Sequence, residues 1–456
     1  MKYFFIKTKT FYLIFSLLLS LVFISYSDAE EAKRDLSLSD AVKKALENNP
    51  RIKAAFFQTE ASKSRITQAR SGILPQIFLN ENFSRTNNPM WAFGTKLNQE
   101  SITASDFDPA RLNNPDGINN FITSVTIEWT LFDGGQTWIG FKQAKLENEA
   151  AILMLERTRE EVIGQTATAY FGLILADEHL YLIRRILDTA RAHSNMARSR
   201  FENGLTVKSD FLRAQVRVSE LEQELFSAES NLLIAKTILC STMGLSSCIP
   251  FQTTPRFDVG DGEEKDADKL VEMALANRKD LKQLLFQEMM AEKEVDKSLA
   301  GHLPSLHLIG NYEIDSESFS DTGDNYMVGA VMRLNLYSGE RISGKTREAS
   351  ALLEKIRAVK NELQLGINIQ VRQAYYQAES SFKRIKAAQA SVLEAEESLR
   401  IVRNRYENGL LTIVSLMDAE SALKQARTSH LKALHDYNIA AVQLKLAAGI
   451  INESLE

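Results

Sequence analysis

The 456-residue sequence is an internal duplication, and this repeat constrains the fold more than any other feature. Residues 200–205 read Arg-Phe-Glu-Asn-Gly-Leu and residues 405–410 read Arg-Tyr-Glu-Asn-Gly-Leu, an offset of 205. At the same offset Leu131-Phe132-Asp133-Gly134 matches Leu336-Tyr337-Ser338-Gly339 and Ala169-Tyr170-Phe171 matches Ala374-Tyr375-Tyr376, whereas Leu74-Pro75 matches Leu303-Pro304 at an offset of 229. Self-similarity of this kind predicts that both halves fold into the same set of elements.

The change of offset locates an insertion in the first half, which holds 24 extra residues between its Leu-Pro and Leu-Phe pairs. The surplus falls in 86–120, a stretch rich in Asn, Asp, Pro and Gly that is typical of an exposed loop. We expect a first repeat over 30–240, a linker or peripheral element over 241–268, and a second repeat over 269–456.

Each repeat contains two strand signals. Apolar and polar side chains alternate from Phe121 to Leu131, which is the pattern of a strand with two different faces. Strands of about ten residues have the length that crosses a bilayer when tilted. The predicted strands are 76–85 and 121–132 in the first repeat, and 306–314 and 326–337 in the second.

Long helices are predicted for most of the remainder. The chain has only 8 prolines, and none lies in 139–240 or 342–456, where proline would interrupt a helix. Apolar residues between Val371 and Tyr406 are spaced alternately by three and four, as in a coiled-coil seam that serves packing. The predicted helices are 139–202 and 209–240 in the first repeat, and 342–407 and 410–448 in the second.

Residues 1–29 are predicted to be a cleaved secretory signal. Three lysines precede the apolar run 11–24, and Ser27 and Ala29 are small residues at the positions that a signal peptidase reads. An N-terminal membrane anchor is the alternative, disfavoured because the run is shorter than the roughly 20 residues that span a bilayer.

The chain has two cysteines, Cys240 and Cys248. In an oxidising compartment they can form a local disulfide, and two separate thiols are the alternative. The sequence does not decide between these states.

The four strands cannot close into a barrel alone. Strands span a membrane only as a closed barrel, for which about eight strands are the usual minimum. Two copies would supply eight strands, with an interior filled by side chains, and three would supply twelve, enough for a lumen. If the strands lie in a membrane, several copies must therefore contribute to one barrel.

The duplicated strand-strand-helix-helix halves, the Leu-Pro strand entries and the paired Arg-(Phe/Tyr)-Glu-Asn-Gly-Leu turns together resemble the TolC-type outer membrane efflux proteins. The resemblance covers about 38–448. It implies a mainly α fold with membrane β structure. It also implies that three copies assemble into a homotrimer, in which a 12-stranded outer membrane β-barrel is continuous with a long periplasmic α-helical barrel. The implied function is the exit duct of a tripartite efflux pump or type I secretion system.

The resemblance also implies partners and a docking site. A periplasmic adaptor (membrane fusion) protein and an inner membrane transporter would be the partners, and outer membrane lipid would surround the strands. The family's adaptor-docking positions match Gly204, Leu205, Gly409 and Leu410 in the two helix-to-helix turns. A glycine there permits the positive φ of a tight reversal, so a plain structural role is compatible with docking.

The resemblance places a periplasmic gate near the same turns. Asp210 and Tyr406 match a linked pair in which the carboxylate accepts a hydrogen bond from the phenol. Asp418 matches one of two constricting aspartates, and we expect its copies to form a cation-attracting ring, although an isolated surface aspartate is the alternative. Leu411 stands where an arginine would make a second link, and Ser415 stands where the other aspartate would lie, so fewer links would hold the gate closed.

Other functions find little support in the sequence. The chain carries a net charge of −5, which disfavours nucleic acid as a partner. Its six histidines lack metal-site spacing, and no nucleophile motif or phosphate-binding loop is present, so we expect no metal, no cofactor and no enzyme activity. The competing class is a periplasmic coiled-coil adaptor or structural protein, which would share the signal, the heptads and the β segments.

Overall fold

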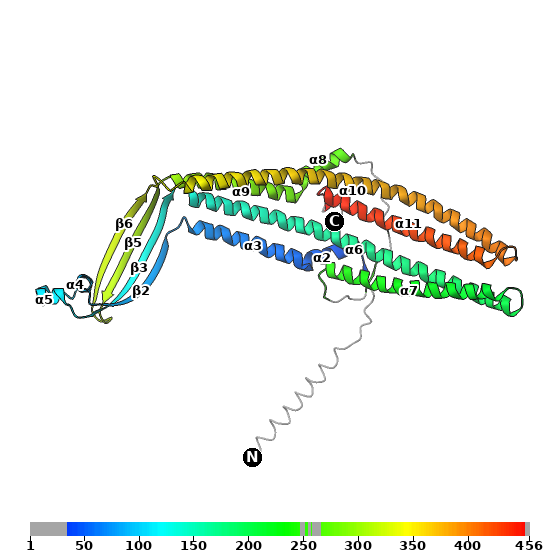
Figure 1. The fold of residues 1–456 in the computed structure, drawn as a ribbon, viewed down its shortest axis with the longest axis horizontal. Coiled ribbons are helices and arrows are strands. Elements are labelled where there is room, and N and C mark those ends of the chain that lie inside the picture. The colour runs from blue at the N-terminus through cyan, green and yellow to red at the C-terminus, as the bar shows by residue number, and fades with distance from the viewer. Residues whose placement is uncertain (1–33, 247–250, 254–256, 258–265, 452–456) are drawn as a thin grey trace, which may run out of the picture.

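The computed structural model describes residues 34–246, 251–253, 257 and 266–451. The protein is elongated, with a β-sheet at one end, two helix-turn-helix tips at the other and shorter elements packed along the middle (Figure 1). The predicted signal segment lies outside the described residues. None of the helices in the described ranges combines the length and the apolar character needed to cross a membrane.

One antiparallel sheet contains four strands in the order β2-β3-β5-β6. The strands are β2 (Gln76–Thr86), β3 (Ile118–Asp133), β5 (Ser305–Ser316) and β6 (Thr322–Arg333). The strand predicted at 326–337 is wrong by four residues at each end. Ser305 begins β5 and pairs with Arg333, so residues after Arg333 have no partner strand in the described part of the chain, whereas Thr322 pairs with Ser316 and extends the hairpin.

The register gives the sheet one apolar face and one polar face. Neighbouring partners on the apolar face include Ile77 with Ile127, Leu79 with Val125, and Tyr312 with Tyr326. On the other face Thr126 donates to Asn311 Oδ1 at 3.0 Å, and Asn311 donates to Glu313 Oε2 at 3.0 Å. Outer membrane strands place apolar side chains toward lipid and polar ones toward the lumen.

The long helices of the two repeats have equal lengths. Helices α6 (Gln136–Glu202) and α10 (Arg341–Glu407) contain 67 residues each, and α7 (Lys208–Thr242) and α11 (Ile413–Ala447) contain 35 each. The prediction of a helix from residue 410 is wrong by three residues. Thr412 has an extended backbone, with ψ of 160°, and serves as the N-cap, so residues 410–412 belong to the turn.

Four helices received no prediction from the sequence. They are α2 (Leu38–Asn48) and α3 (Pro50–Ser71) in the first repeat, and α8 (Ala267–Asn277) and α9 (Lys279–Leu299) in the second. A local signal existed, because Ser37 and Asp40 form a capping box and Pro50 occupies a favoured first helical position. Helix α3 packs on α6, and α9 packs on both α6 and α10.

The segment predicted as an exposed loop folds into α4 (Pro89–Asn98), a 3-10 turn (Ala104–Phe107) and α5 (Pro109–Asn113). We call residues 89–113 the rim insert. The loop prediction is wrong here because Asn88 and Asp108 act as N-caps before Pro89 and Pro109, so the same polar and proline residues start helices.

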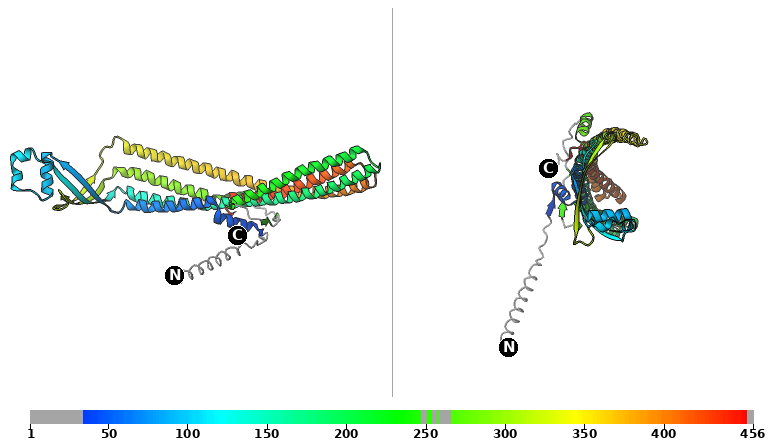
Figure 2. Two further views of the ribbon diagram at one scale, coloured as in Figure 1. Left: turned by 90° about the horizontal axis from the view of Figure 1, so that it is seen from below. Right: turned by 90° about the vertical axis from the view of Figure 1, so that its left-hand side faces the viewer.

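The middle of the molecule holds the largest apolar core, formed by α2, α6, α7 and α11. Leu173, Ile174, Leu239 and Ile451 are at most 1% exposed there. Next to this core β1 (Arg34–Leu36) pairs in parallel with β4 (Phe251–Thr253). Viewed end-on, the long helices form an arch, and these short elements lie on its convex side (Figure 2).

Cys240 is 3% exposed and disulfide-bonded, as the first of the two alternatives predicted. Cys248 lies outside the described residues.

A 3-10 turn, Ala300–His302, links α9 to the start of β5.

Candidate functional site

Both helix-to-helix turns adopt the same hydrogen-bonded conformation. Gly204 has φ of 67° and Gly409 has φ of 74°, a left-handed conformation that is costly for other residues. Leu205 N–H donates to the Arg200 carbonyl at 2.8 Å, and Leu410 N–H donates to the Arg405 carbonyl at 2.9 Å. These are Schellman motifs, in which glycine ends one helix and releases the chain into the next.

The turns present apolar side chains to solvent at the far end of the molecule. Leu205 is 77% exposed and Leu410 is 72% exposed, and Val207 beside the first turn is also exposed. Leucines held at the ends of long rigid helices offer apolar contact area to a partner, because their burial would be favourable.

Behind the turns, Tyr406 joins the two helical hairpins. It is 7% exposed in a cluster that includes Ala197 and Ala214 from the first hairpin and Ile413 and Leu416 from the second. Burial of one aromatic ring by both hairpins holds their ends together.

The guanidinium of Arg200 adds a second link. Its carbon lies 4.8 Å from the centre of the Tyr406 ring, within the range of a cation–π interaction. Arg200 also donates from Nη2 to the Glu407 carbonyl at 3.3 Å. One side chain of the first hairpin therefore contacts both the ring and the backbone of the second.

The structure does not join Asp210 to Tyr406 by a hydrogen bond within the described residues. Asp210 instead accepts from Thr206 Oγ1 at 2.8 Å, inside its own turn. Thr206 lies four residues before Asp210, so the local donor occupies the carboxylate. Arg200, rather than Asp210, makes the polar contact with Tyr406, and sequence reasoning missed it because Arg200 carried no sign of its partner in the other repeat.

The remaining gate positions lie at the start of α11. Leu411 is half-buried in the turn, and Ser415 lies beside Thr412 with 3.4 Å between their hydroxyl oxygens. Asp418 is exposed, and no hydrogen bond or ion pair involves it within the described part of the chain. The carboxylate of Asp418 is therefore accessible to solvent beside α11.

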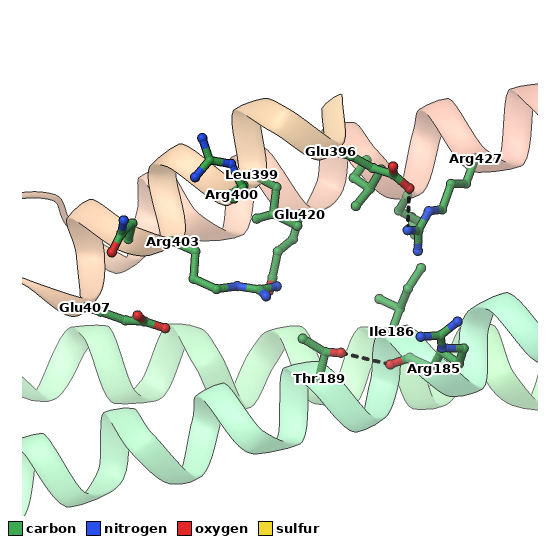
Figure 3. Close-up of a pocket in the computed structure, with 13 residues that line it drawn as sticks. Arg185, Ile186, Thr189, Glu396, Leu399, Arg400, Arg403, Glu407, Glu420 and Arg427 are labelled. Atoms are coloured by element: carbon green, nitrogen blue, oxygen red, sulfur yellow. Dashed lines mark hydrogen bonds and ion pairs between the residues drawn. The ribbon is translucent and has the colours of Figure 1, made fainter. Parts of the chain in front are cut away.

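A charged groove of about 560 Å³ lies between the two hairpins, next to the turns and on the side of the turns that faces the middle of the molecule. In Figure 3 Arg403 and Glu420 extend from α10 and α11 toward α6, and Glu396 pairs with Arg427 at 2.7 Å. Among the described residues, two close contacts between polar side chains cross between the hairpins: His193 Nδ1 lies 2.8 Å from Glu420 Oε1, and Lys424 forms an ion pair with Glu224 at 2.7 Å. The partners are 227 and 200 residues apart in sequence (420 − 193 and 424 − 224), so no local pattern could predict these contacts.

Among the described residues, the groove and the turns contain polar contacts that link the two hairpins. Together with the two-faced sheet and the long continuous helices, this arrangement is that of a channel subunit. A model of the family "Outer membrane efflux protein" matches residues 41–245 and 270–450, and the chain belongs to this family.

Curated relatives span nearly the whole chain. The alkaline protease secretion protein AprF of Pseudomonas aeruginosa is 26% identical, with 92% of this chain and 85% of that protein covered. The outer membrane protein TolC of Vibrio cholerae is 23% identical, with 91% of each chain covered. The solved structure of the Campylobacter jejuni outer membrane channel CmeC has the same fold, with a TM-score of 0.75, 18% identity and coverage of 91% and 86%.

The protein is therefore an outer membrane channel for export whose helices extend into the periplasm. This result confirms the TolC-type resemblance and the mainly α fold with a membrane sheet. The alternative of a periplasmic coiled-coil adaptor is wrong.

Proposed function

We propose that three copies form the channel, with a 12-stranded barrel continuous with a helical tube. The observation that carries this proposal is the sheet itself, whose outer strands β2 and β6 each have one edge without a partner strand in the described protomer. Unpaired strand edges cannot face lipid, so they must pair with neighbouring copies. Two copies would give eight strands and a lumen filled by side chains, which does not suit a duct.

The mass of the detergent-solubilised protein tests this assembly. Light scattering with the detergent contribution subtracted should give three chains per particle. A particle of one or two chains would overturn the proposal.

The tips are proposed to dock a periplasmic adaptor (membrane fusion) protein that links the duct to an inner membrane transporter. Leu205 and Leu410 supply the apolar contacts, and Gly204 and Gly409 shape the turns that present them. Such a duct would be the passive exit of a tripartite efflux pump or of a type I secretion system. Of these two systems, the secretion system is favoured, because the relative AprF is named an alkaline protease secretion protein.

Photo-crosslinking in the native cell tests this docking. A photoreactive residue at Leu205 or Leu410 should trap an inner-membrane-anchored adaptor. The same residue at Leu393, which is 63% exposed on α10 but remote from the tip, should not. Equal trapping at Leu393, or none at the tip, would reject the docking site.

The gate is proposed to open when the second hairpin moves away from the first. Tyr406 would then leave its shared cluster, Arg200 would lose both contacts, and Asp210 would keep its bond to Thr206 or turn to a neighbouring copy. An adaptor can drive this change only if it binds the open state more tightly than the closed state.

Asp418 is proposed to form a cation-attracting ring where three copies meet. Its exposure and lack of a partner in the described protomer support the proposal, because a free carboxylate attracts cations most strongly where equal charges converge. In planar bilayers, Asp418→Ala should reduce cation selectivity and block by multivalent cations. Unchanged selectivity and unchanged block would show that Asp418 is an ordinary surface residue.

A further inference from the structure

The rim insert is attached to one particular face of the sheet, at the end remote from the helices (Figure 1). Gln99 directly follows α4 and is 4% exposed. Its Nε2 donates to the Asn119 carbonyl and to Asn120 Oδ1, both at 2.8 Å. The insert is thus bonded to the start of β3 through a buried side chain.

The attachment continues across the sheet to β5 and β6. Asn120 donates from Nδ2 to Asp315 Oδ1 at 2.6 Å, and Asp315 is fully buried. Asn325 donates to Asp315 Oδ2 at 3.5 Å and to the Asn98 carbonyl at 3.4 Å. A buried carboxylate is costly unless it is hydrogen-bonded, so this network favours the docked insert over an undocked one.

Gly323 on β6 provides independent evidence of close docking. A Cβ atom built on Gly323 would lie 2.1 Å from the Asn98 carbonyl oxygen, so the insert approaches β6 where only glycine fits. Gly329, farther along the same strand and on the same face, has nothing within 4 Å of such an atom.

Strand register identifies the face that the insert covers. Asp315 pairs with both Ile122 and Gly323, so these three residues share a face with Asn120 and Asn325. This is the face that carries Thr126, Asn311 and Glu313 farther down the strands, the polar face of the sheet. In an outer membrane barrel the polar face lines the lumen.

The rim insert is also held together by contacts between its own side chains. Phe93 of α4 packs edge-to-face on Phe107 at 5.8 Å, and Lys96 pairs with Asp106 at 2.7 Å. Hydrogen bonds from Lys96 and Thr103 hold the pKa of Asp106 well below its usual range, so this pair stays charged across ordinary pH values. Because these contacts hold the insert together as one folded unit, it would narrow an opening more effectively than an unstructured loop.

We propose that the rim insert is a size-limiting cap in the external mouth of the channel, docked on the lumen face by the Gln99-Asn120-Asp315-Asn325 network. It restricts entry of bulky solutes from outside. The second repeat has only residues 317–321 between its two strands, so each copy would contribute one cap. The proposal rests on the proposed assembly, because the polar face is a lumen only in a closed barrel.

The register allows a clean deletion. Thr86 of β2 pairs with Ile118 of β3, so residues 87–117 can be replaced by an Asn-Gly turn that closes a two-residue hairpin. A milder variant is Gly323→Val, which should displace the insert from β6 without removing it. Gly329→Val is its matched control on the same strand and face.

Access to the lumen is measured with a single cysteine below the cap. Ser124→Cys lies on the polar face, and Val125→Cys on the apolar face is its matched control. Cys240 is bridged and does not react. Intact cells are labelled with a small maleimide and with a polyethylene-glycol maleimide of about 5 kDa, because pore width limits access of the larger reagent.

The deletion should raise the labelling rate of Ser124→Cys by the large reagent about tenfold and Gly323→Val about threefold, because both widen the constriction. The small reagent should label Ser124→Cys at similar rates in all of these variants, and Gly329→Val should leave the labelling rate of the large reagent unchanged. An unchanged large-reagent rate in the deletion would overturn the cap while leaving the channel intact. Failure of the small reagent to label Ser124→Cys would instead reject a water-filled lumen, and with it the proposed assembly.

Discussion

Helices α6 and α10 occupy equivalent places in the two repeats and have the same length, but they are held in different ways. Twenty residues of α6 are buried in the protomer, against eight of α10. Helix α6 packs on α2, α3, α7, α9 and α11, whereas α10 packs on α8, α9 and α11. One duplicated helix thus lies at the centre of the protomer and the other at its edge.

Ion pairs partly replace apolar burial along α10. Glu288 of α9 pairs with Arg357 at 3.2 Å and with Lys360 at 2.5 Å, and Arg372 pairs with Asp268 of α8. The residue of α3 that matches Glu288 is Thr59, which bonds to carbonyls within the first repeat. Partly exposed ion pairs contribute little to stability. We therefore expect α10 to be held less firmly than α6 and to be the helix that moves in gating.

The largest expected difference concerns the core of α6. Leu173 is 1% exposed, so Leu173→Ala should lower the free energy of unfolding by about 3 kcal/mol through lost burial and a cavity. Leu393→Ala on the exposed face of α10 should change it by less than about 0.5 kcal/mol. Urea unfolding of the solubilised protein measures both. Equal losses would show that α10 is as firmly buried as α6.

Tyr406 and Phe201, which hold the same place in the two tips, give the next prediction. Tyr406 is buried by both hairpins, whereas Phe201 is half-buried and stacks on Phe211 of its own hairpin at 6.3 Å. Tyr406→Ala should therefore raise the open fraction of the channel in planar bilayers by at least tenfold, since about 1.4 kcal/mol suffices for that change. Phe201→Ala should raise it less. A larger effect of Phe201→Ala than of Tyr406→Ala would mean that the first tip, and not Tyr406, holds the channel closed.

The pH dependence of α10 follows from Glu288. Hydrogen bonds from Lys360, followed by those from Arg357, lower the pKa of Glu288 from its usual value. A folded-state pKa below that of the unfolded chain adds stability above the unfolded pKa, and this stability is lost as the pH falls through the folded pKa. Glu288→Gln should thus cost about 1 kcal/mol at pH 7 and progressively less in acid.

Unfolding curves at neutral and acidic pH measure this effect. Glu394→Gln, an exposed carboxylate on α10, is the control and should show no such trend. A constant cost for Glu288→Gln at every pH would mean that its side chain acts through packing instead of charge.

The smallest effect is expected for Arg200. Arg200→Gln removes the cation–π contact with Tyr406, worth about 0.5 to 1 kcal/mol, and should raise the open fraction a few-fold. Arg405→Gln, at the matching position of the second repeat, should change it less. If the two variants behave alike, Arg200 does not link the hairpins.

Local sequence patterns predicted the elements whose signals repeat. The alternation around Phe121, the proline-free stretches and the paired glycines indicated strands, long helices and turns close to their observed places. Where Ser37 and Asp40 or Asn88 and Pro89 start helices, the signals were present but were read as loop or left unassigned.

Contacts between distant segments were not predictable in the same way. Arg200 meets Tyr406, and His193 meets Glu420, only because the fold lays one repeat against the other. The attachment of Gln99 to Asn120 and Asp315 likewise depends on strand register across both repeats. The difference between α6 and α10 arises from neighbours in space, which two nearly equal sequence patterns cannot reveal.

The conductance of the purified wild-type protein in planar bilayers tests most directly whether the protein forms a gated channel. A channel built from the polar face of this sheet and closed by the second hairpin should give discrete, cation-selective steps, mostly of low open fraction, and Tyr406→Ala should lengthen the open periods. Failure to conduct ions after verified insertion into the bilayer would contradict the channel function.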